Sequence, residues 1–179
     1  NGVYKVLDDG LSVEYTKPIL KKASIKIPDT ITVNGITCKV TGISANAFKN
    51  NASLKSITIG NNVITIGTNA FYGCKKLNKV SGGACIIKIG NKAFANCGSL
   101  SSITIPAAVR NIGKQAFYNC KNLRTIIIKT SALSSKNIGS KAFAGTYQKP
   151  TVKVPAKQMK AYKKLLKSKG MSSKAAYKK

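Results

Sequence analysis

The sequence contains no histidine, and its only acidic residues lie in the first 29 positions: Asp8, Asp9, Glu14 and Asp29. Residues 30 to 179 therefore lack the pair of carboxylates that many general acid–base mechanisms use. A cysteine nucleophile would have no histidine base, and a hard metal ion would find no side-chain carboxylate there. No glycine-rich segment has the spacing of a phosphate-binding loop. We expect no catalytic residue, no metal site and no cofactor.

A secretion signal and a membrane-spanning run are both absent from the printed sequence, which begins directly with NGVYKV. A mature chain would already have lost its signal, so this absence says little against secretion. We expect no insertion into a membrane.

Negative charge is scarce, whereas positive charge is abundant: 31 Lys and Arg against 4 acids give a net charge of +27. Five of these cations precede residue 30, which leaves 31 − 5 = 26 cations and no acid in residues 30 to 179. The excess is either a solubilising coat or an attraction to polyanions such as acidic glycans, acidic proteins or nucleic acid. Nucleic acid is disfavoured, because the aromatic residues are mostly regularly spaced phenylalanines, which we assign to the core, and not base-stacking platforms.

One pattern recurs along the chain and is marked by the Ala-Phe pair. The only five phenylalanines stand 23, 23, 23 and 26 residues apart, at Phe48, Phe71, Phe94, Phe117 and Phe143. Isoleucine precedes each by five residues, and leucine follows the first four by six. The repeat reads I-G-x-x-A-F-x-x-C-x-x-L-x-x-I-x-I. A fixed period in the twenties is typical of a solenoid in which each repeat stacks on the one before.

Each part of the repeat predicts a different local structure. The alternation in L-x-x-I-x-I indicates a strand with one buried face. Segments such as NKAFANC suit a single helical or 3₁₀ turn, and a second short strand begins near Val63 and its equivalents. Successive strands should pair in parallel about 4.8 Å apart. The three extra residues between Phe117 and Phe143 should form a loop that leaves the buried positions in register.

The segment AFANCGSLSSITIPAAVRNIGKQAF, residues 93 to 117, carries nearly every fixed position of this pattern. It resembles the BspA-like leucine-rich repeat family, and the resemblance covers about residues 36 to 155. It implies a bacterial surface or secreted protein involved in adhesion to host proteins or to other cells. Together these features predict an α/β-type leucine-rich-repeat solenoid of about five 23-residue coils, with a parallel β-sheet and short helical turns.

The two ends differ from the repeats and are expected to cap them. Residues 1–35 should hold a β-hairpin around Asp8-Asp9-Gly10 and an incomplete first coil. Residues 36–155 hold the leucine-rich repeats. Residues 156–179 should form a capping helix that stops at Gly170, followed by a short strand or a loose tail. We expect the protein to be a monomer.

Three of the five cysteines, Cys74, Cys97 and Cys120, each follow a phenylalanine by three residues. Stacked thiols could hold zinc or form a disulfide, but paired C-x-x-C motifs and histidines are missing, and parallel side-chain directions disfavour a disulfide. We interpret these three as small buried packing residues. Cys38 and Cys85 lie outside this column.

Residues between the buried positions of the strands should face outward and form a flat surface rich in Ser, Thr and cations. The candidate binding face consists of Lys55, Thr58, Lys79, Ser102, Thr104, Arg124, Thr125 and Lys129. Solenoids often bind partners on such faces. We expect a non-catalytic, secreted or surface-exposed bacterial adhesion module that binds a host or cell-surface protein or an acidic glycan. The alternatives are a structural spacer that displays other domains and a polyanion or nucleic-acid binder that acts through net charge.

Overall fold

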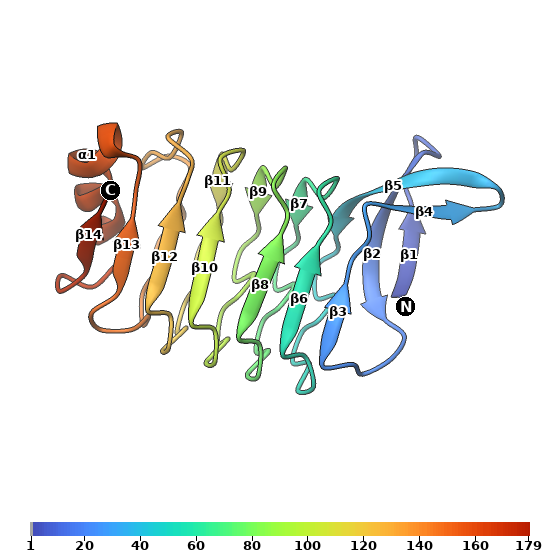
Figure 1. The fold of residues 1–179 in the computed structure, drawn as a ribbon, viewed down its shortest axis with the longest axis horizontal. Coiled ribbons are helices and arrows are strands. Elements are labelled where there is room, and N and C mark those ends of the chain that lie inside the picture. Colours follow the sequence, from blue (N-terminus) through green and yellow to red (C-terminus); the bar gives the residue numbers. More distant parts are fainter. Residues whose placement is uncertain (1) are drawn as a thin grey trace.

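The computed structural model describes residues 2–179 and shows an elongated solenoid whose coils are stacked along one axis (Figure 1). One side of the solenoid is built from what we call the front strands, which run parallel in two groups, β3-β6-β8 and β10-β12-β13-β14. Their bounds are Ser24–Lys26, Ser56–Ile59 and Lys79–Gly82 for the first group, and Ser102–Ile105, Thr125–Ile128, Thr151–Lys153 and Ala176–Lys178 for the second.

The described chain therefore has about seven turns, two more than the five complete coils expected from the phenylalanines. The additional front strands are β3, from the incomplete first coil, and β14 at the C-terminal end. Neither follows an Ala-Phe pair in the sequence, so counting phenylalanines misses both.

The opposite side of the solenoid is held by a second sheet that continues through the stack. Its order is β1-β2-β5-β7-β9-β11, with β4 paired to β5. The bounds are Gly2–Val6, Ser12–Pro18, Thr30–Val33 and Ile36–Ile43 for β1, β2, β4 and β5, and Thr65–Ile66, Lys88–Ile89 and Asn111–Ile112 for β7, β9 and β11. We call β7, β9 and β11 the back strands. A single parallel bridge between Ile112 and Ile138 extends the sheet into the next coil.

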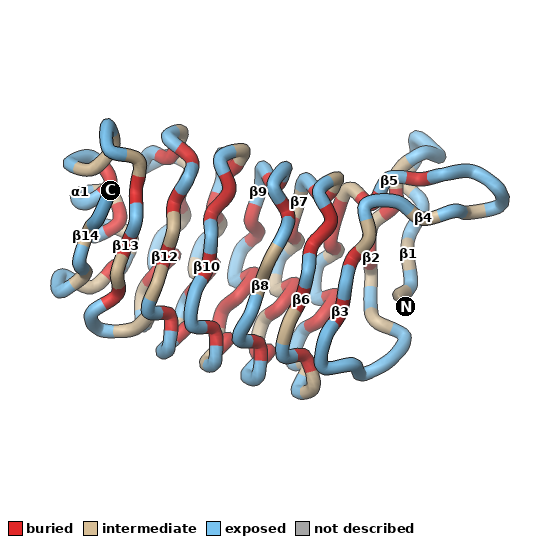
Figure 2. Tube along the Cα trace, viewed as in Figure 1, coloured by how far each residue is buried: buried red, intermediate tan, exposed pale blue. Residues whose placement is uncertain are grey.

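The core is a continuous column inside the coils (Figure 2). The five phenylalanine rings stack with centroids 5.0 to 5.4 Å apart and planes within 11° of parallel. Phe143 lies 5.4 Å from Phe117, so the three extra residues leave the stack in register, as predicted. Tyr15 covers the N-terminal end of the stack at 5.2 Å from Phe48. The leucine and isoleucine columns are buried with it.

The segments around the phenylalanines are short turns, as expected, but they are not continuous helices. The amide of Lys49 bonds to the carbonyl of Asn46 within the turn, whereas the next amide, that of Asn50, bonds to Tyr72 of the following coil. Amides that bond within the turn thus alternate with amides that bond to the next coil, and this pattern requires left-handed backbone at two positions in each turn. Asn46, at φ +61°, and Asn50, at φ +57°, are examples. Asparagine tolerates this conformation better than most residues.

The N-terminal end contains two hairpins, one of which the sequence analysis missed. Strands β1 and β2 pair antiparallel as predicted. The second hairpin joins β4 to β5 through Asn34 and Gly35, at φ +49° and +80°, and projects beyond the stack (Figure 1). Asn-Gly between two extended runs is a strong hairpin signal, so the sequence did contain the information.

The C-terminal end is covered by helix α1 (Met159–Ser168), as predicted, which follows a 3₁₀ turn, η1 (Ala156–Gln158). Tyr162 and Leu166 are its buried residues. The Tyr162 hydroxyl donates to the carbonyl of Thr130 and accepts the amide of Leu133, both at 3.0 Å. The helix is thereby tied to the inserted loop, which buries Leu133.

Replacing Phe94 with alanine in the middle of the stack should destabilise the protein by about 3–5 kcal/mol, because it leaves a cavity between two parallel rings. Urea unfolding followed by circular dichroism measures the change in the free energy of unfolding. Tyr118→Ala removes an aromatic ring that is 37% exposed, and should cost well under half as much. Equal losses from the two variants would contradict a stability that depends on the buried stack.

Candidate binding surface

The eight residues of the candidate binding face lie along the front strands. Thr58, Lys79, Ser102, Thr104 and Thr125 are within β6, β8, β10 and β12. Lys55 and Arg124 immediately precede a strand, and Lys129 follows β12. Seven of the eight side chains are exposed, and Thr125 is half-buried.

The outward direction of these residues follows from the buried positions on either side. Ile57 and Ile59 of β6, and Ile103 and Ile105 of β10, are buried, so the residue between each pair must point away from the core. Hydroxyls on this face also link neighbouring strands: Thr58 and Ser81 are 3.2 Å apart, and Ser56 donates to Ser24 at 2.9 Å. The face therefore has a fixed backbone and partly fixed polar groups.

The cations on this face differ in how firmly they are held. The Arg124 guanidinium carbon lies 4.1 Å from the centre of the Tyr147 ring, a cation–π contact. Tyr147 lies in the turn after Phe143 and was not anticipated as part of the face, because no earlier coil has an aromatic residue at this position. Lys55, Lys79 and Lys129 occupy different positions within their coils, so the four cations do not form one row.

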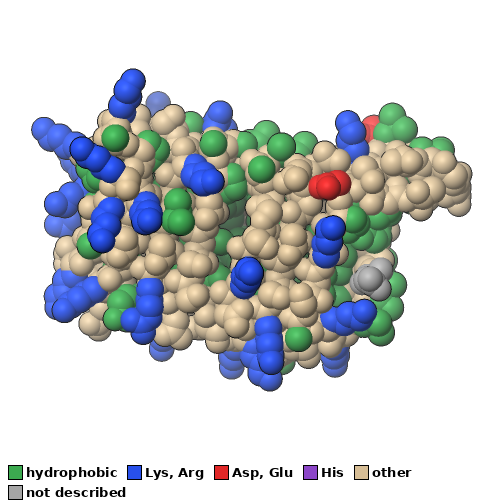
Figure 3. Space-filling view, in the orientation of Figure 1, with side chains coloured by type: hydrophobic (Ala, Val, Ile, Leu, Met, Phe, Trp, Pro, Cys, Tyr) green, Lys and Arg blue, Asp and Glu red, His purple; other side chains and the backbone are tan. Residues whose placement is uncertain are grey.

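Basic side chains are spread over the molecule and are crowded toward the end that carries α1 (Figure 3). Helix α1 alone contributes Lys160, Lys163, Lys164 and Lys167. Acids appear only near the opposite end, because none occurs after Asp29. An approaching anion therefore meets a positive field along most of the stack.

A hollow that the sequence analysis did not predict lies along the turns that follow the phenylalanines. It has a volume of about 560 Å³ and is lined mainly by polar residues: Asn50, Tyr72, Gly73, Lys75, Asn96, Gly98, Ser99, Asn119, Lys121 and Asn122. The side-chain amide of Asn119 donates to that of Asn96 at 2.9 Å. The signal in the sequence was the asparagine two residues after Phe48, Phe94 and Phe117. Tyr72 lines this hollow, and Tyr118 is exposed.

The cysteine column is a packing feature, as interpreted from the sequence. The thiols of Cys74, Cys97 and Cys120 are free and buried, and each donates to the carbonyl oxygen of the phenylalanine 26 residues earlier, at 3.0 to 3.1 Å. Burial raises the pKa of Cys74 and of Cys120 to about 12 and raises that of Cys97 further. A neutral thiol that donates a hydrogen bond suits this buried site, and a thiolate does not.

Residues 41–170 match the family model of the BspA type leucine rich repeat region, in six copies. The chain belongs to the BspA-type leucine-rich repeat family. The BspA-type repeat is a scaffold that generally serves protein interaction without catalysis. No helix in residues 2–179 has the length and the apolar character needed to cross a bilayer.

Several solved leucine-rich repeat structures share this solenoid fold. A leucine-rich repeat protein of T. pallidum, TpLRR, is 26% identical, with a TM-score of 0.75 over 86% of this chain and 69% of its own. A leucine-rich repeat protein of Bacteroides capillosus is 29% identical, with a TM-score of 0.64 over 70% of this chain and 91% of its own. The fold is also shared by a leucine-rich cell surface protein of Faecalibacterium prausnitzii. That protein is 24% identical, with a TM-score of 0.58 over 83% of this chain and 52% of its own. No curated protein matches the sequence significantly.

The native protein should have one rapidly reactive thiol, that of Cys85, which is the exposed cysteine among the five. A thiol reagent such as Ellman's at pH 8 reacts with thiolate, which burial suppresses at Cys74, Cys97 and Cys120. We expect about one fast equivalent in the folded protein and five in urea. Cys85→Ser should remove the fast phase, and a fast phase that survives this substitution would contradict the assignment.

Proposed function

We propose that this chain is a non-catalytic adhesion module exposed outside a bacterial cell, which binds a host or cell-surface protein or an acidic glycan. The interaction-scaffold character of the family supports the binding part of the proposal. Placement at the cell surface is supported by the resemblance to a family whose members are mostly surface or secreted proteins.

The observation that carries the proposal is the chemistry of the candidate binding face. Its side chains, apart from the half-buried Thr125, are exposed on two groups of parallel strands. They combine hydroxyls with cations, and no side-chain carboxylate occurs after Asp29 to neutralise them. Hydroxyls and cations suit hydrogen-bonded recognition of an acidic surface or a sulfated or carboxylated glycan. Within each paired group, strands about 4.8 Å apart also place successive side chains within reach of one extended ligand.

Binding through this face should depend on particular residues as well as on net charge. We expect binding to heparin and to a sialylated mucin to weaken when four cations of the face are replaced together by serine: Lys55, Lys79, Arg124 and Lys129. The loss should exceed that from changing Lys157, Lys160, Lys164 and Lys167 to serine at the α1 end. Surface plasmon resonance on immobilised ligand measures both, and the second variant matches the first in charge change. Because the attraction is electrostatic, affinity should also fall steeply between roughly 0.05 and 0.5 M salt.

Equal weakening by the two variants would mean that net charge alone drives binding and that the front strands are not a site. Absence of binding to either ligand, together with absence of binding to host-cell surface proteins, would favour the alternative in which the solenoid is a spacer for other domains.

A further inference from the structure

The row of front strands is interrupted once within the described chain, between β8 and β10. Strand β8 pairs only with β6, and β10 pairs only with β12. In the coils of Leu54, Leu77 and Leu123 the residue after the leucine gives its amide to the preceding coil, as Asn78 does to Lys55 and Arg124 does to Ser101, both at 2.9 Å. In residues 2–179 no such bond joins Ser101 to Asn78. The back strands β9 and β11 stay paired behind the interruption, so the solenoid is open on one side only.

The interruption has a cause in the sequence. Gly82 stands where the neighbouring coils carry Ile59 and Ile105, so one buried side chain is missing from the column. Its φ is +79°, and a Cβ there would overlap the carbonyl oxygen of Ile59, so the position requires glycine. One coil further, Pro106 stands where Gly83 and Lys129 donate amides to the preceding strand. Proline has no amide hydrogen and cannot close that bond.

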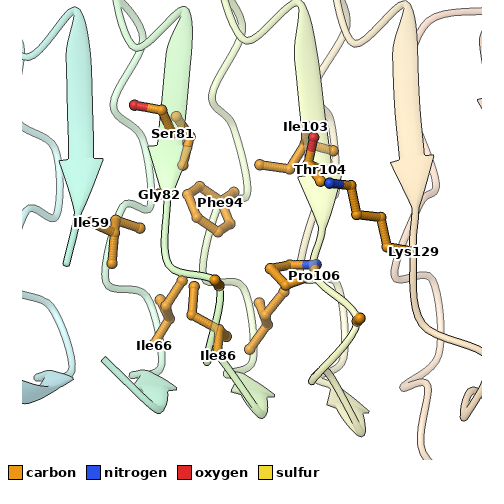
Figure 4. A pocket seen from close by; sticks show the side chains of 14 residues that line it. Ile59, Ile66, Ser81, Gly82, Ile86, Phe94, Ile103, Thr104, Pro106 and Lys129 are labelled. Atoms are coloured by element: carbon orange, nitrogen blue, oxygen red, sulfur yellow. The ribbon is translucent and has the colours of Figure 1, made fainter. Parts of the chain in front are cut away.

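The two departures from the repeat, Gly82 and Pro106, leave a cavity of about 510 Å³ that opens between β8 and β10 (Figures 3 and 4). Ile66 of β7 and Ile89 of β9 line it together with residues of β8 and β10, so side chains that the back strands contribute to the core form its inner wall. Its depth is formed by Ile59, Ile66, Ile86, Ile89, Phe94 and Ile103. Such a lining offers no hydrogen bond from a side chain, so the buried part of an occupant must be apolar.

The mouth of the cavity is different in character. Thr104 supplies a hydroxyl at the edge, and the Lys129 side chain extends from the end of β12 toward Thr104 (Figure 4). The Ser81 hydroxyl points toward β6 instead and lies 3.2 Å from that of Thr58. Residues 30 to 179 contain no side-chain carboxylate, so Lys129 finds no acidic side chain in the repeats or the C-terminal end to pair with. An apolar cavity with one unneutralised ammonium and one hydroxyl at its rim is complementary to a carboxylate that carries an aliphatic tail.

We propose that this cavity is a binding site for a linear aliphatic carboxylate, of the medium-chain fatty acid class. The tail enters between β8 and β10 and contacts Phe94 and the isoleucines, and the carboxylate remains at the rim beside Lys129. This function is separate from macromolecule binding by the candidate binding face, although Thr104 and Lys129 border both.

Isothermal titration calorimetry with decanoate, kept below the concentration at which it forms micelles, tests the proposal. The wild-type protein should bind one equivalent saturably. Lys129→Gln should weaken binding about tenfold or more, because it removes a charge-assisted contact. Val80→Phe should abolish binding by filling the cavity from β8, with folding verified by circular dichroism. If that variant does not fold, Ala107→Phe at the mouth serves the same purpose.

The matched control is Lys153→Gln, which removes an equal charge from β13 outside the cavity and should leave decanoate affinity within about twofold of the wild type. Decanol should bind the wild type more weakly than decanoate does, and acetate should not bind. In NMR spectra the terminal methyl signal of bound decanoate should shift through the ring current of Phe94. Three results would overturn the proposal. The first is an absence of saturable decanoate binding, and the second is binding retained in a folded Val80→Phe or Ala107→Phe variant. The third is equal weakening of decanoate binding by Lys129→Gln and Lys153→Gln. None of these results bears on heparin or mucin binding, so the two proposals fail independently.

Discussion

The stacking of each coil on an almost identical neighbour, about 5 Å away, constrains every other feature of this protein. The ring spacing of 5.0 to 5.4 Å in the phenylalanine column is close to the strand spacing of about 4.8 Å, so aromatic stacking and backbone hydrogen bonding are satisfied together. The close approach also dictates the glycine that follows Ile66, Ile89, Ile112 and Ile138. A Cβ on Gly67 or Gly113 would lie 2.5 Å from a backbone nitrogen of the preceding coil.

The same constraint separates positions that must repeat from positions that are free to vary. A buried residue meets its own counterpart in the next coil, so an isoleucine or cysteine that fits once fits each time, and the buried columns are nearly uniform. An exposed lysine repeated at the same spacing would face like charges within about 5 Å. The scatter of the cations among different positions in each coil is consistent with avoiding this repulsion. It also gives the outer surface a pattern that is not periodic.

The interruption between β8 and β10 shows what happens where the repeat departs from its pattern. One isoleucine becomes Gly82 and one amide donor becomes Pro106, and both changes act on the same junction between coils. The phenylalanine stack and the back strands continue past this point, with Phe71, Phe94 and Phe117 still stacked. The stack can therefore accommodate a cavity locally without losing register. Departures from a consistent pattern are often found at functional sites, and this one combines apolar depth with a single uncompensated cation.

The sequence by itself determined the solenoid, the identity of the buried columns and the burial of Cys74, Cys97 and Cys120, because a residue that recurs every 23 positions meets its equivalent in the next coil. It also contained signals that were missed, such as Asn34-Gly35 for the second hairpin. Only the tertiary structure decided that β8 and β10 do not pair and that Tyr147 holds Arg124. In the sequence Gly82 is a single weak position in a strand pattern. Its consequence depends on Ile59 in the preceding coil and Pro106 in the following one, and periodicity cannot reveal how three such residues combine in space.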